Sequence, residues 1–483
     1  MDGIMKNTKA DRYYRILLAF VSTALVLVLA NSTSILQKHS YGYDSAIFLY
    51  VGKCMNKGMI PYRDMYDIKG PVLWLIEGLG ELIHGERTGV HILEIINFNI
   101  FIQLVYSSAK LYVNSIKALT VSAVTLIFWG AVIQGGNTAE EFSAAFTMAA
   151  VYLALKAVND EKRQSSKLYW YVYGLMTAFT ALIRMVNCIV IAAIVVYMLV
   201  AMLKRHEFKR AVISCVIGLA GIATVTLPFM LYYYSKGALS EMIDAILLFS
   251  IRYTDFNKSS QNIVYFGYLI SSAAIAIWGI IQGERRLSPL LLVTDIFCTL
   301  LYLKMGTHYP HYMGLGIPCV TIGVMLLFKL FENKRNVKAV AAVVLAFALV
   351  NGRYVTLCAN LTLHELMNIA AGDVKAENVV FAEHIAELIP EEDKGDVYSY
   401  GVEAVIPYVA DTYSKSKYFV SQRQWIKDEA MREKLYTDFV DTNSRYAITN
   451  ADTNDIIGEY IHQNYTAIYE YGKYVLYEIN KDN

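Results

Sequence analysis

Eight polar side chains stand in short polar stretches of an otherwise apolar chain, where they could do chemistry. They are four carboxylates, two cations and two imidazoles: Asp44, Asp67, Glu140, Glu141, Lys69, Arg184, His308 and His311. A positioned carboxylate can remove the proton of an attacking hydroxyl group, which typically accelerates a reaction by about 10²–10⁴-fold. A fixed cation beside a departing oxyanion is worth roughly 3 kcal/mol. The set therefore suits a reaction in which a hydroxyl group attacks and an anion leaves.

Most of these residues also have a structural alternative. Asp44 stands where the N-cap of a helix is expected, and Asp67 lies in a stretch that could form a turn. The long side chain of Lys69 could extend to lipid headgroups. Glu140 and Glu141 stand at the edge of an apolar run, where one of them could cap a helix. The charge of Arg184, between two apolar runs, is costly unless it is paired or hydrated.

The composition indicates a membrane protein. Of the 483 residues, 56% are hydrophobic and 18% are charged, and the mean hydropathy is +0.37. A soluble domain carries about 25% charged residues. The net charge of +1, without a basic block, argues against nucleic acid as a partner. The six cysteines show no metal-ligand spacing, and no P-loop or Rossmann glycine pattern is found, so we expect no cofactor.

Apolar runs of about the length that crosses a bilayer recur along the chain. We predict about eleven spans, at residues 16–36, 88–109, 118–133, 142–157, 168–183, 188–203, 211–232, 263–281, 287–303, 312–330 and 339–357. Lys and Arg gather in every second connecting segment, which places these segments and the amino terminus in the cytoplasm. An odd number of spans then places the carboxyl end outside the cytoplasm.

The fold class is mainly α, and two domains are predicted. Residues 1–362 form a polytopic helical membrane bundle, and residues 363–483 form a small α/β extracytoplasmic domain. In the second domain, residues 397–400, 418–420 and 446–449 read as strands, and residues 466–479 as a closing hairpin. Its helices are predicted at residues 403–409, 425–439 and 455–463.

The first outer loop, residues 37–87, is too long for a passive connection. One amphipathic helix is predicted from Asp44 to a stop at Gly58, because Ile47, Phe48 and Val51 recur at helical spacing. A second is predicted to begin at Pro71. Both are too short to cross a bilayer and suit helices lying at the membrane interface.

Several runs in this loop and elsewhere resemble GT-C superfamily glycosyltransferases, including the bacterial lipid A aminoarabinose transferases and the protein O-mannosyltransferases. The matching runs are Tyr43-Asp44-Ser45-Ala46-Ile47-Phe48, Gly58, Pro61-Tyr62, Asp64, Asp67, Lys69-Gly70-Pro71, then Gly135-Gly136-Asn137-Thr138-Ala139-Glu140-Glu141 and His311-Tyr312. The first loop carries the specific part of the likeness. The predicted topology and the outer C-terminal domain extend it over most of the chain.

The resemblance implies an enzyme that transfers a sugar from a polyprenyl phosphate, inverting and independent of metal. It implies that Asp44 is the general base and that Lys69 contacts the lipid phosphate. Where the family commonly has an Asp-Glu pair, Ser45 follows Asp44, so a metal site or mechanism built on adjacent acids is not supported. We further expect Arg184 and His311 to contact the donor phosphate. Asp67, Glu140, Glu141 and His308 are expected to contact the acceptor or the sugar.

The sequence thus predicts a multi-pass cell-membrane glycosyltransferase. Its expected partners are a polyprenyl-phosphate-linked sugar donor, an unidentified cell-envelope acceptor and membrane lipid. Two alternatives remain: a transporter or flippase of lipid-linked glycans, and a non-catalytic membrane assembly protein. Transporters usually carry internal repeats and polar breaks near the bilayer midplane, whereas the polar residues here gather at the outer ends of the predicted spans.

Overall fold

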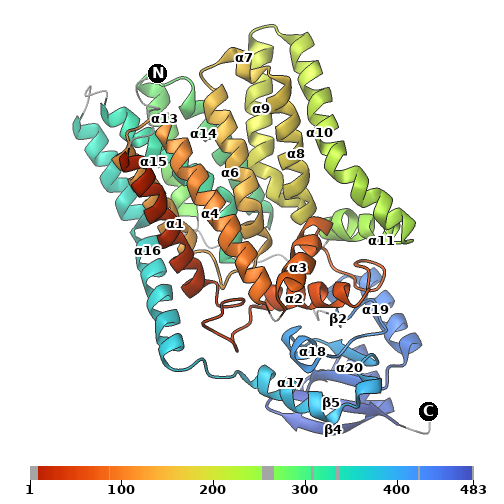
Figure 1. Ribbon diagram of the computed structural model, residues 1–483. Coiled ribbons are helices and arrows are strands. Elements are labelled where there is room, and N and C mark those ends of the chain that lie inside the picture. The colour runs from red at the N-terminus through yellow and green to blue at the C-terminus, as the bar shows by residue number, and fades with distance from the viewer. Residues whose placement is uncertain are drawn as a thin grey trace. The chain divides into compact units, whose positions relative to one another are not determined.

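The computed structural model describes residues 9–85, 87–252, 266–305, 309–332, 337–421 and 425–480. The chain is mainly helical, with a small sheet in its C-terminal part (Figure 1). It divides into two compact units. Unit 1 comprises Met1–Ala30, Leu93–Phe229 and Ser259–Met367, and unit 2 comprises Asn31–Ile92, Met230–Lys258 and Asn368–Asn483. Helices α4, α10 and α16 each run from one unit into the other.

The bundle of unit 1 is built from helices that follow one another along the chain. They are α1 (Lys9–Leu29), α4 (Thr88–Lys110), α5 (Ser115–Gly130), α6 (Ala139–Ala157), α7 (Glu161–Gln164), α8 (Lys167–Ile183), η1 (Met185–Cys188), α9 (Ile189–Lys204), α10 (Phe208–Ser235), α13 (Gly267–Ile281), α14 (Leu287–Met305), η4 (Pro310–Gly316), α15 (Ile317–Glu332) and α16 (Val337–Ala370). Each of the eleven predicted apolar segments overlaps one of these helices. Helices satisfy their own backbone hydrogen bonds, which lipid cannot do.

Length and apolar composition allow six helices of the described chain to cross a membrane. These are Lys9–Leu29, Thr88–Lys110, Met185–Lys204, Phe208–Ser235, Leu287–Met305 and Pro310–Glu332. Helices α5 and α13 are apolar but shorter. The chain is therefore a multi-pass membrane protein, whereas the total of about eleven spans and the orientation of the termini stay predictions.

Small residues allow close helix packing in unit 1. A Cβ atom added to Gly174 of α8 would lie 2.1 Å from the carbonyl oxygen of Gly218 on α10. Larger side chains fill the interior, where Phe98 and Phe101 of α4 contact Trp129 of α5. Without a hydrophobic force between helices in lipid, such close contact is what holds them together.

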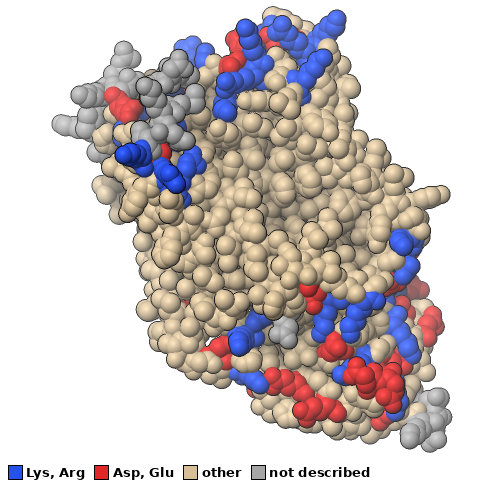
Figure 2. All heavy atoms as spheres, in the orientation of Figure 1, with Lys and Arg blue, Asp and Glu red and all other residues tan. Residues whose placement is uncertain are grey.

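Charged side chains are distributed unevenly over the surface of unit 1. Figure 2 shows a wide face of this unit without them, and Lys and Arg gathered at its end over α7 and the turn between α9 and α10. The basic residues there include Lys162, Arg163 and Arg205. This clustering agrees with the alternation of basic segments seen in the sequence.

Unit 2 contains the two short helices predicted in the first outer loop. Helix α2 is Tyr43–Asn56 and helix α3 is Pro71–Ile83. Gly58 follows the end of α2 with a φ of 89°, the left-handed conformation that glycine adopts without strain. The helices pack tightly, since a Cβ atom added to Gly52 would lie 2.9 Å from the backbone of Glu77. The helices are confirmed, and their interfacial position stays a prediction.

The C-terminal part of unit 2 is a small mixed α/β structure, as predicted. Its elements are α17 (Glu377–Leu388), η5 (Glu391–Asp393), β1 (Val397–Tyr400), α18 (Val405–Ala410), β2 (Val420–Ser421), η6 (Trp425–Lys427), α19 (Glu429–Thr442), β3 (Tyr446–Asn450), α20 (Ile456–Asn464), β4 (Tyr465–Tyr471) and β5 (Tyr474–Ile479). The strand order is β2-β1-β3-β5-β4. Strand β1 pairs in parallel with β2 and β3, and β5 is antiparallel to β3 and β4.

Side chains of α2 fasten this sheet region to the first outer loop within unit 2. Lys53 Nζ lies 2.7 Å from Asp411 Oδ1, and Tyr50 donates a hydrogen bond of 3.0 Å to the carbonyl oxygen of Thr412. The Tyr50 ring also stacks on Phe419. The compact unit therefore combines the loop with the C-terminal segment, and the predicted domain boundary at residues 362 and 363 stays a prediction.

Candidate functional site

The two residues singled out in the first outer loop meet in unit 2. Lys69 Nζ lies 3.5 Å from Asp44 Oδ2, although the residues are twenty-five positions apart. Asp44 belongs to the first turn of α2, and Lys69 immediately precedes Gly70, the N-cap of α3. The close packing of α2 on α3 thus brings the carboxylate and the ammonium group together.

The two members of this ion pair differ in accessibility. The side chain of Lys69 is 9% exposed, whereas that of Asp44 is 36% exposed. The ammonium group also lies 5.0 Å from the centre of the Phe48 ring, a cation–π contact that favours the charged form. A carboxylate open to the surface is suited to proton transfer with an incoming group, and a largely buried cation is suited to stabilising an anion.

Helix capping does not account for Asp44. The N-cap of α2 is Gly42, in extended conformation, and Asp44 is the second residue inside the helix. The capping alternative is therefore wrong. A negative charge in the first turn does interact favourably with the helix dipole, by about 0.3–1 kcal/mol.

The backbone of Lys69 is held on both sides by buried side chains. Asp67 Oδ1 accepts a 2.9 Å hydrogen bond from the Lys69 N–H group, and the Tyr62 hydroxyl donates a 2.7 Å bond to the Lys69 carbonyl oxygen. Trp74 Nε1 in turn donates to the Tyr62 oxygen at 3.1 Å. We call Tyr62, Asp67 and Trp74 the Lys69 clamp. It fixes the position from which the lysine side chain extends.

Backbone strain and burial mark the Lys69 clamp as a specialised segment. Tyr62 is fully buried and has a φ of 71°, an unusual value for a bulky residue that costs on the order of 1–3 kcal/mol. Asp67 is 4% exposed, and its burial raises the pKa of its carboxyl group, while the charge of Lys69 opposes this effect. Its geometry also fits the turn-forming alternative, because it bonds the N–H group two residues ahead.

Three further predicted residues meet in unit 1. Arg184 Nη1 lies 2.6 Å from Glu140 Oε1, and Nη2 donates a 2.9 Å hydrogen bond to the hydroxyl oxygen of Tyr312. His311 Nε2 lies 3.8 Å from Glu140 Oε2, and its Nδ1 is 2.6 Å from Gln134 Oε1. The Glu140 side chain is 2% exposed. The cluster is thus a buried ion pair in which the carboxylate offsets the charge of the arginine.

A strained turn positions this cluster. Gln134, Gly135, Gly136 and Asn137 all have positive φ values, between 49° and 87°. Gly136 is required there, because an added Cβ atom would lie 2.4 Å from Ala30 Cβ. Thr138 then caps α6 by accepting a hydrogen bond from the N–H group of Glu141, so neither acidic residue is the cap.

The remaining predicted site residues have different outcomes. Glu141 is fully buried, and its carbonyl oxygen accepts a 2.7 Å bond from Asn97. His308 lies outside the described residues. Sequence reasoning assigned no role to Tyr62, Trp74, Gln134 or Tyr312, although Tyr62 and Tyr312 belong to the runs that carry the resemblance. Within the described parts of the chain, no group of three or more His, Cys, Asp or Glu residues could hold a metal ion.

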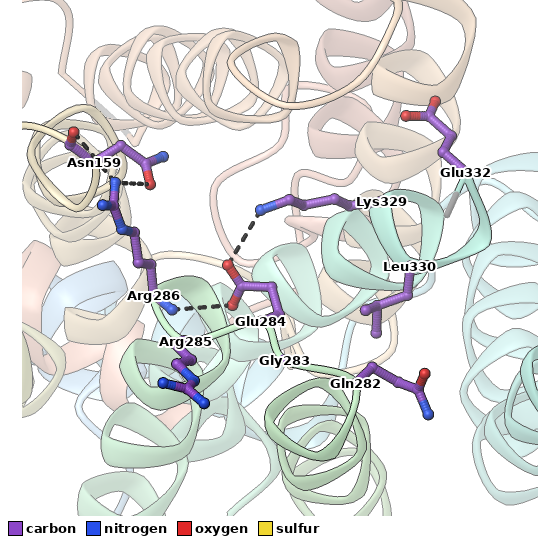
Figure 3. Close-up of a pocket in the computed structure, with 9 residues that line it drawn as sticks. All are labelled: Asn159, Gln282, Gly283, Glu284, Arg285, Arg286, Lys329, Leu330 and Glu332. Atoms are coloured by element: carbon purple, nitrogen blue, oxygen red, sulfur yellow. Dashed lines mark hydrogen bonds and ion pairs between the residues drawn. The ribbon is translucent and has the colours of Figure 1, made fainter. Parts of the chain in front are cut away.

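A polar pocket of about 580 Å³ lies in unit 1 at the ends of α13, α14 and α15 (Figure 3). Its charged groups largely satisfy one another. Glu284 binds Lys329 at 3.1 Å and accepts a hydrogen bond from the N–H group of Arg286, whose side chain in turn donates to Asn159. This network joins two helix connections and the end of α15, and we interpret the pocket as structural.

The chain is similar to known proteins in part of its sequence and in its fold. A family profile described as dolichyl-phosphate-mannose-protein mannosyltransferase matches residues 69–233. A search of curated proteins found no match. The crystal structure of ArnT from Cupriavidus metallidurans bound to undecaprenyl phosphate is similar, with a TM-score of 0.61, 13% identity, and coverage of 96% of this chain and 97% of that chain.

Two archaeal structures from Archaeoglobus fulgidus are also similar. The apo oligosaccharyltransferase gives a TM-score of 0.58 at 12% identity, covering 97% of this chain and 75% of that chain. The oligosaccharyltransferase AglB in complex with an inhibitory peptide and a dolichol-phosphate gives 0.54 at 12%, with coverage of 92% and 70%. Structural likeness at this identity shows the fold. Together with the family profile, it confirms the resemblance to GT-C superfamily glycosyltransferases.

Proposed function

We propose that this chain is a membrane glycosyltransferase that moves a sugar from a polyprenyl-phosphate donor to an acceptor outside the cytoplasm. The observation that carries the proposal is the pair of Asp44 and Lys69, 3.5 Å apart in the loop that resembles GT-C enzymes. The fold likeness supports it, because the similar structure of ArnT has undecaprenyl phosphate bound and that of AglB is a complex with a dolichol-phosphate.

The proposed reaction uses one base and one cation. An acceptor hydroxyl oxygen attacks the anomeric carbon of the donor sugar and forms the new glycosidic bond. The bond from that carbon to the phosphate oxygen breaks, and its electron pair leaves with the polyprenyl phosphate. Asp44 takes the hydroxyl proton, and Lys69 stabilises the charge that develops on the departing phosphate.

The exposure of the two side chains supports this division of roles. Asp44 is accessible enough for an acceptor to reach it, whereas Lys69 is held by the Lys69 clamp in a setting of low exposure. An ammonium group fixed in advance needs no reorganisation when charge develops, which makes it effective. We assign Asp67 a positioning role through the Lys69 N–H group, and its contact with the acceptor stays a prediction.

The residues of unit 1 carry the remaining predicted contacts. Contact of Arg184 and His311 with the donor phosphate stays a prediction, as does contact of Glu140, Glu141 and His308 with the acceptor or sugar. Arg184 is already paired with Glu140 at 2.6 Å, so a phosphate would have to compete with that carboxylate.

The test is sugar transfer by the purified full chain in nanodiscs, with radiolabelled polyprenyl-phosphate hexoses and a panel of candidate acceptors. Asp44→Asn should lower kcat by about 10²–10⁴-fold because the base is lost. Lys69→Met should lower it by about 10²–10³-fold because the leaving phosphate loses its cation. Asp64→Asn is the matched control. Asp64 lies in the same loop, but it pairs with Arg63 and accepts a hydrogen bond from the N–H group of Ile60.

The results of this assay distinguish the glycosyltransferase from the flippase alternative. Full transfer by Asp44→Asn would remove Asp44 as the base. Movement of the lipid-linked sugar across the bilayer without transfer would instead support the flippase alternative.

A further inference from the structure

A second pocket, this one in unit 2, adjoins the loop that carries Lys69. It has a volume of about 670 Å³ and lies among Tyr66 of the first outer loop, residues 240–244, Lys417, Tyr418 and helix α19. Pockets that hold small molecules commonly measure about 300–1,000 Å³. We call it the Tyr66 pocket.

The loop is anchored firmly at this pocket. The Tyr66 hydroxyl donates a 2.8 Å hydrogen bond to Asp244 Oδ2, and its N–H group donates a 2.7 Å bond to the carbonyl oxygen of Lys417. The Tyr66 ring packs against Tyr418, with 5.4 Å between ring centres. Burial and the bond to Asp244 both raise the pKa of Tyr66, which keeps the phenol a hydrogen-bond donor.

The chain itself limits the distance between this pocket and the Asp44–Lys69 pair. Only two residues separate Tyr66 from Lys69, so their Cα atoms are at most about 11 Å apart. Asp67, the first of the two, also bonds the Lys69 N–H group. A ligand in the pocket is therefore near the proposed reaction centre, within the same compact unit.

Most of the charged side chains that line the pocket are negative. Carboxylates outnumber ammonium groups, and the lining includes Glu241, Asp244, Glu433, Asp438 and Asp441 against Lys417 and Lys434. Such a lining repels a phosphate or carboxylate and disfavours ligands that bear one. Carboxylate oxygens accept strong hydrogen bonds from hydroxyl and especially ammonium groups. The donor phosphate is therefore a poor occupant, and a hydroxyl-rich ligand without anionic groups is a good one.

We propose that the Tyr66 pocket binds the sugar acceptor and selects a hydroxyl-rich acceptor that is uncharged or carries amino groups. This inference rests on the proposed transferase function and names the class of its second substrate. The half-buried carboxylate of Glu241 and the exposed carboxylate of Asp441 hold hydroxyl or ammonium groups of the acceptor. The Tyr66–Asp244 contact joins the pocket to the loop that carries Lys69.

The test measures binding separately from transfer, with the full chain in nanodiscs. The probes are three trisaccharides: the glucosamine trimer, its uncharged N-acetylated form triacetylchitotriose, and trigalacturonate. Their binding is followed by saturation-transfer NMR, and each is also tested as an acceptor with the radiolabelled donor. We expect the glucosamine trimer to bind best and trigalacturonate at least about tenfold more weakly. Glu241→Gln and Asp441→Asn should each weaken binding of the glucosamine trimer and raise its KM by about tenfold, with the donor KM unchanged.

Glu429→Gln is the matched control, because Glu429 is on α19 but pairs with Arg432 and does not line the pocket. Equal binding of trigalacturonate, or no binding of either uncharged or amino probe, would overturn the inference. So would unchanged acceptor binding and KM in both pocket variants. If the pocket variants alter binding while no probe receives sugar, the pocket stands and the proposed transfer fails.

Discussion

Removal of a single oxygen atom should show whether the Lys69 clamp serves the reaction. Tyr62→Phe keeps the ring, which contacts Tyr233 with 5.1 Å between ring centres, and deletes the hydroxyl. That hydroxyl donates to the Lys69 carbonyl oxygen at 2.7 Å and accepts from Trp74 Nε1 at 3.1 Å. The change therefore removes two buried hydrogen bonds without touching Asp44 or the Lys69 side chain.

The magnitude follows from the groups left behind. A typical buried hydrogen bond contributes about 1 kcal/mol, and a buried group left without its partner costs about 1–3 kcal/mol. Tyr62→Phe leaves the Trp74 N–H group without this acceptor, so we expect a loss of roughly 2–3 kcal/mol in all. Part of this loss should appear as lower protein stability. The part that reflects misplacement of Lys69 should appear in kcat, as a reduction of about tenfold or more.

The assay combines thermal unfolding in nanodiscs with kcat and KM for transfer. Trp74→Phe is the informative partner variant, since it removes the N–H donor but leaves the Tyr62 bond to Lys69. It should lower kcat less than Tyr62→Phe, and the double variant should show less than the sum of the two effects. Tyr234→Phe is the control, because Tyr234 is 73% exposed and neighbours Tyr233 on α10.

Two results would refute this reasoning. If Tyr62→Phe lowered the unfolding temperature but left kcat unchanged, the Lys69 clamp would be structural and Lys69 would not need it. If both variants reduced kcat equally, the effect would come from general loosening of the loop and not from the bond to the Lys69 carbonyl.

Other consequences of the packing can be tested by thermal unfolding. Arg184→Ala leaves the buried carboxylate of Glu140 without its arginine partner and should lower the free energy of unfolding by about 3–5 kcal/mol. Adding Glu140→Gln should restore part of this stability, and no recovery would contradict the pairing. Gly52→Ala should destabilise the chain by about 1–3 kcal/mol through overpacking, whereas Gly352→Ala, with open space around it, should not. Burial opposes ionisation of Asp411, but the bond from Lys53 and nearby lysine charges outweigh it and lower its pKa. The stability that this pairing contributes is therefore present above the ordinary carboxyl pKa and disappears as the pH falls through the lowered pKa. Asp411→Asn should accordingly make the unfolding temperature depend less on pH below about pH 4. Because Asp411 is 37% exposed, the effect should stay below about 1 kcal/mol.

Local signals in the sequence predicted the secondary structure of unit 2 well. Strand β1 lies at the predicted residues, and Gly472, with a φ of 58°, forms the turn of the predicted closing hairpin. The second strand begins two residues later than predicted. Its first predicted residue, Tyr418, donates its N–H group to Ser416 Oγ, a local bond that keeps it out of the ladder.

Pairing between distant residues could not be predicted in the same way. The first helix was expected to begin at residue 16, but α1 begins at Lys9. Asp11 is buried there, accepts a 2.6 Å bond from Tyr106 and pairs with Lys110 at 3.1 Å. These partners lie almost a hundred residues away, so the hydropathy of the segment gave no sign that its polar end would be helical.

The same distinction separates the two clusters of candidate site residues. Local patterns predicted the two short helices that carry Asp44 and follow Lys69, and the resemblance to GT-C enzymes assigned these two residues to one site. Glu140 lies on α6 and Arg184 is the C-cap residue of α8; the sequence does not encode locally how these helices pack, and the 2.6 Å pairing was not predicted. Counting cations therefore overstates the positive potential of unit 1, because a buried pair presents little net charge. Lys69, whose partner Asp44 is partly open to water and can release it to a phosphate, is the better candidate for the cation that meets the donor.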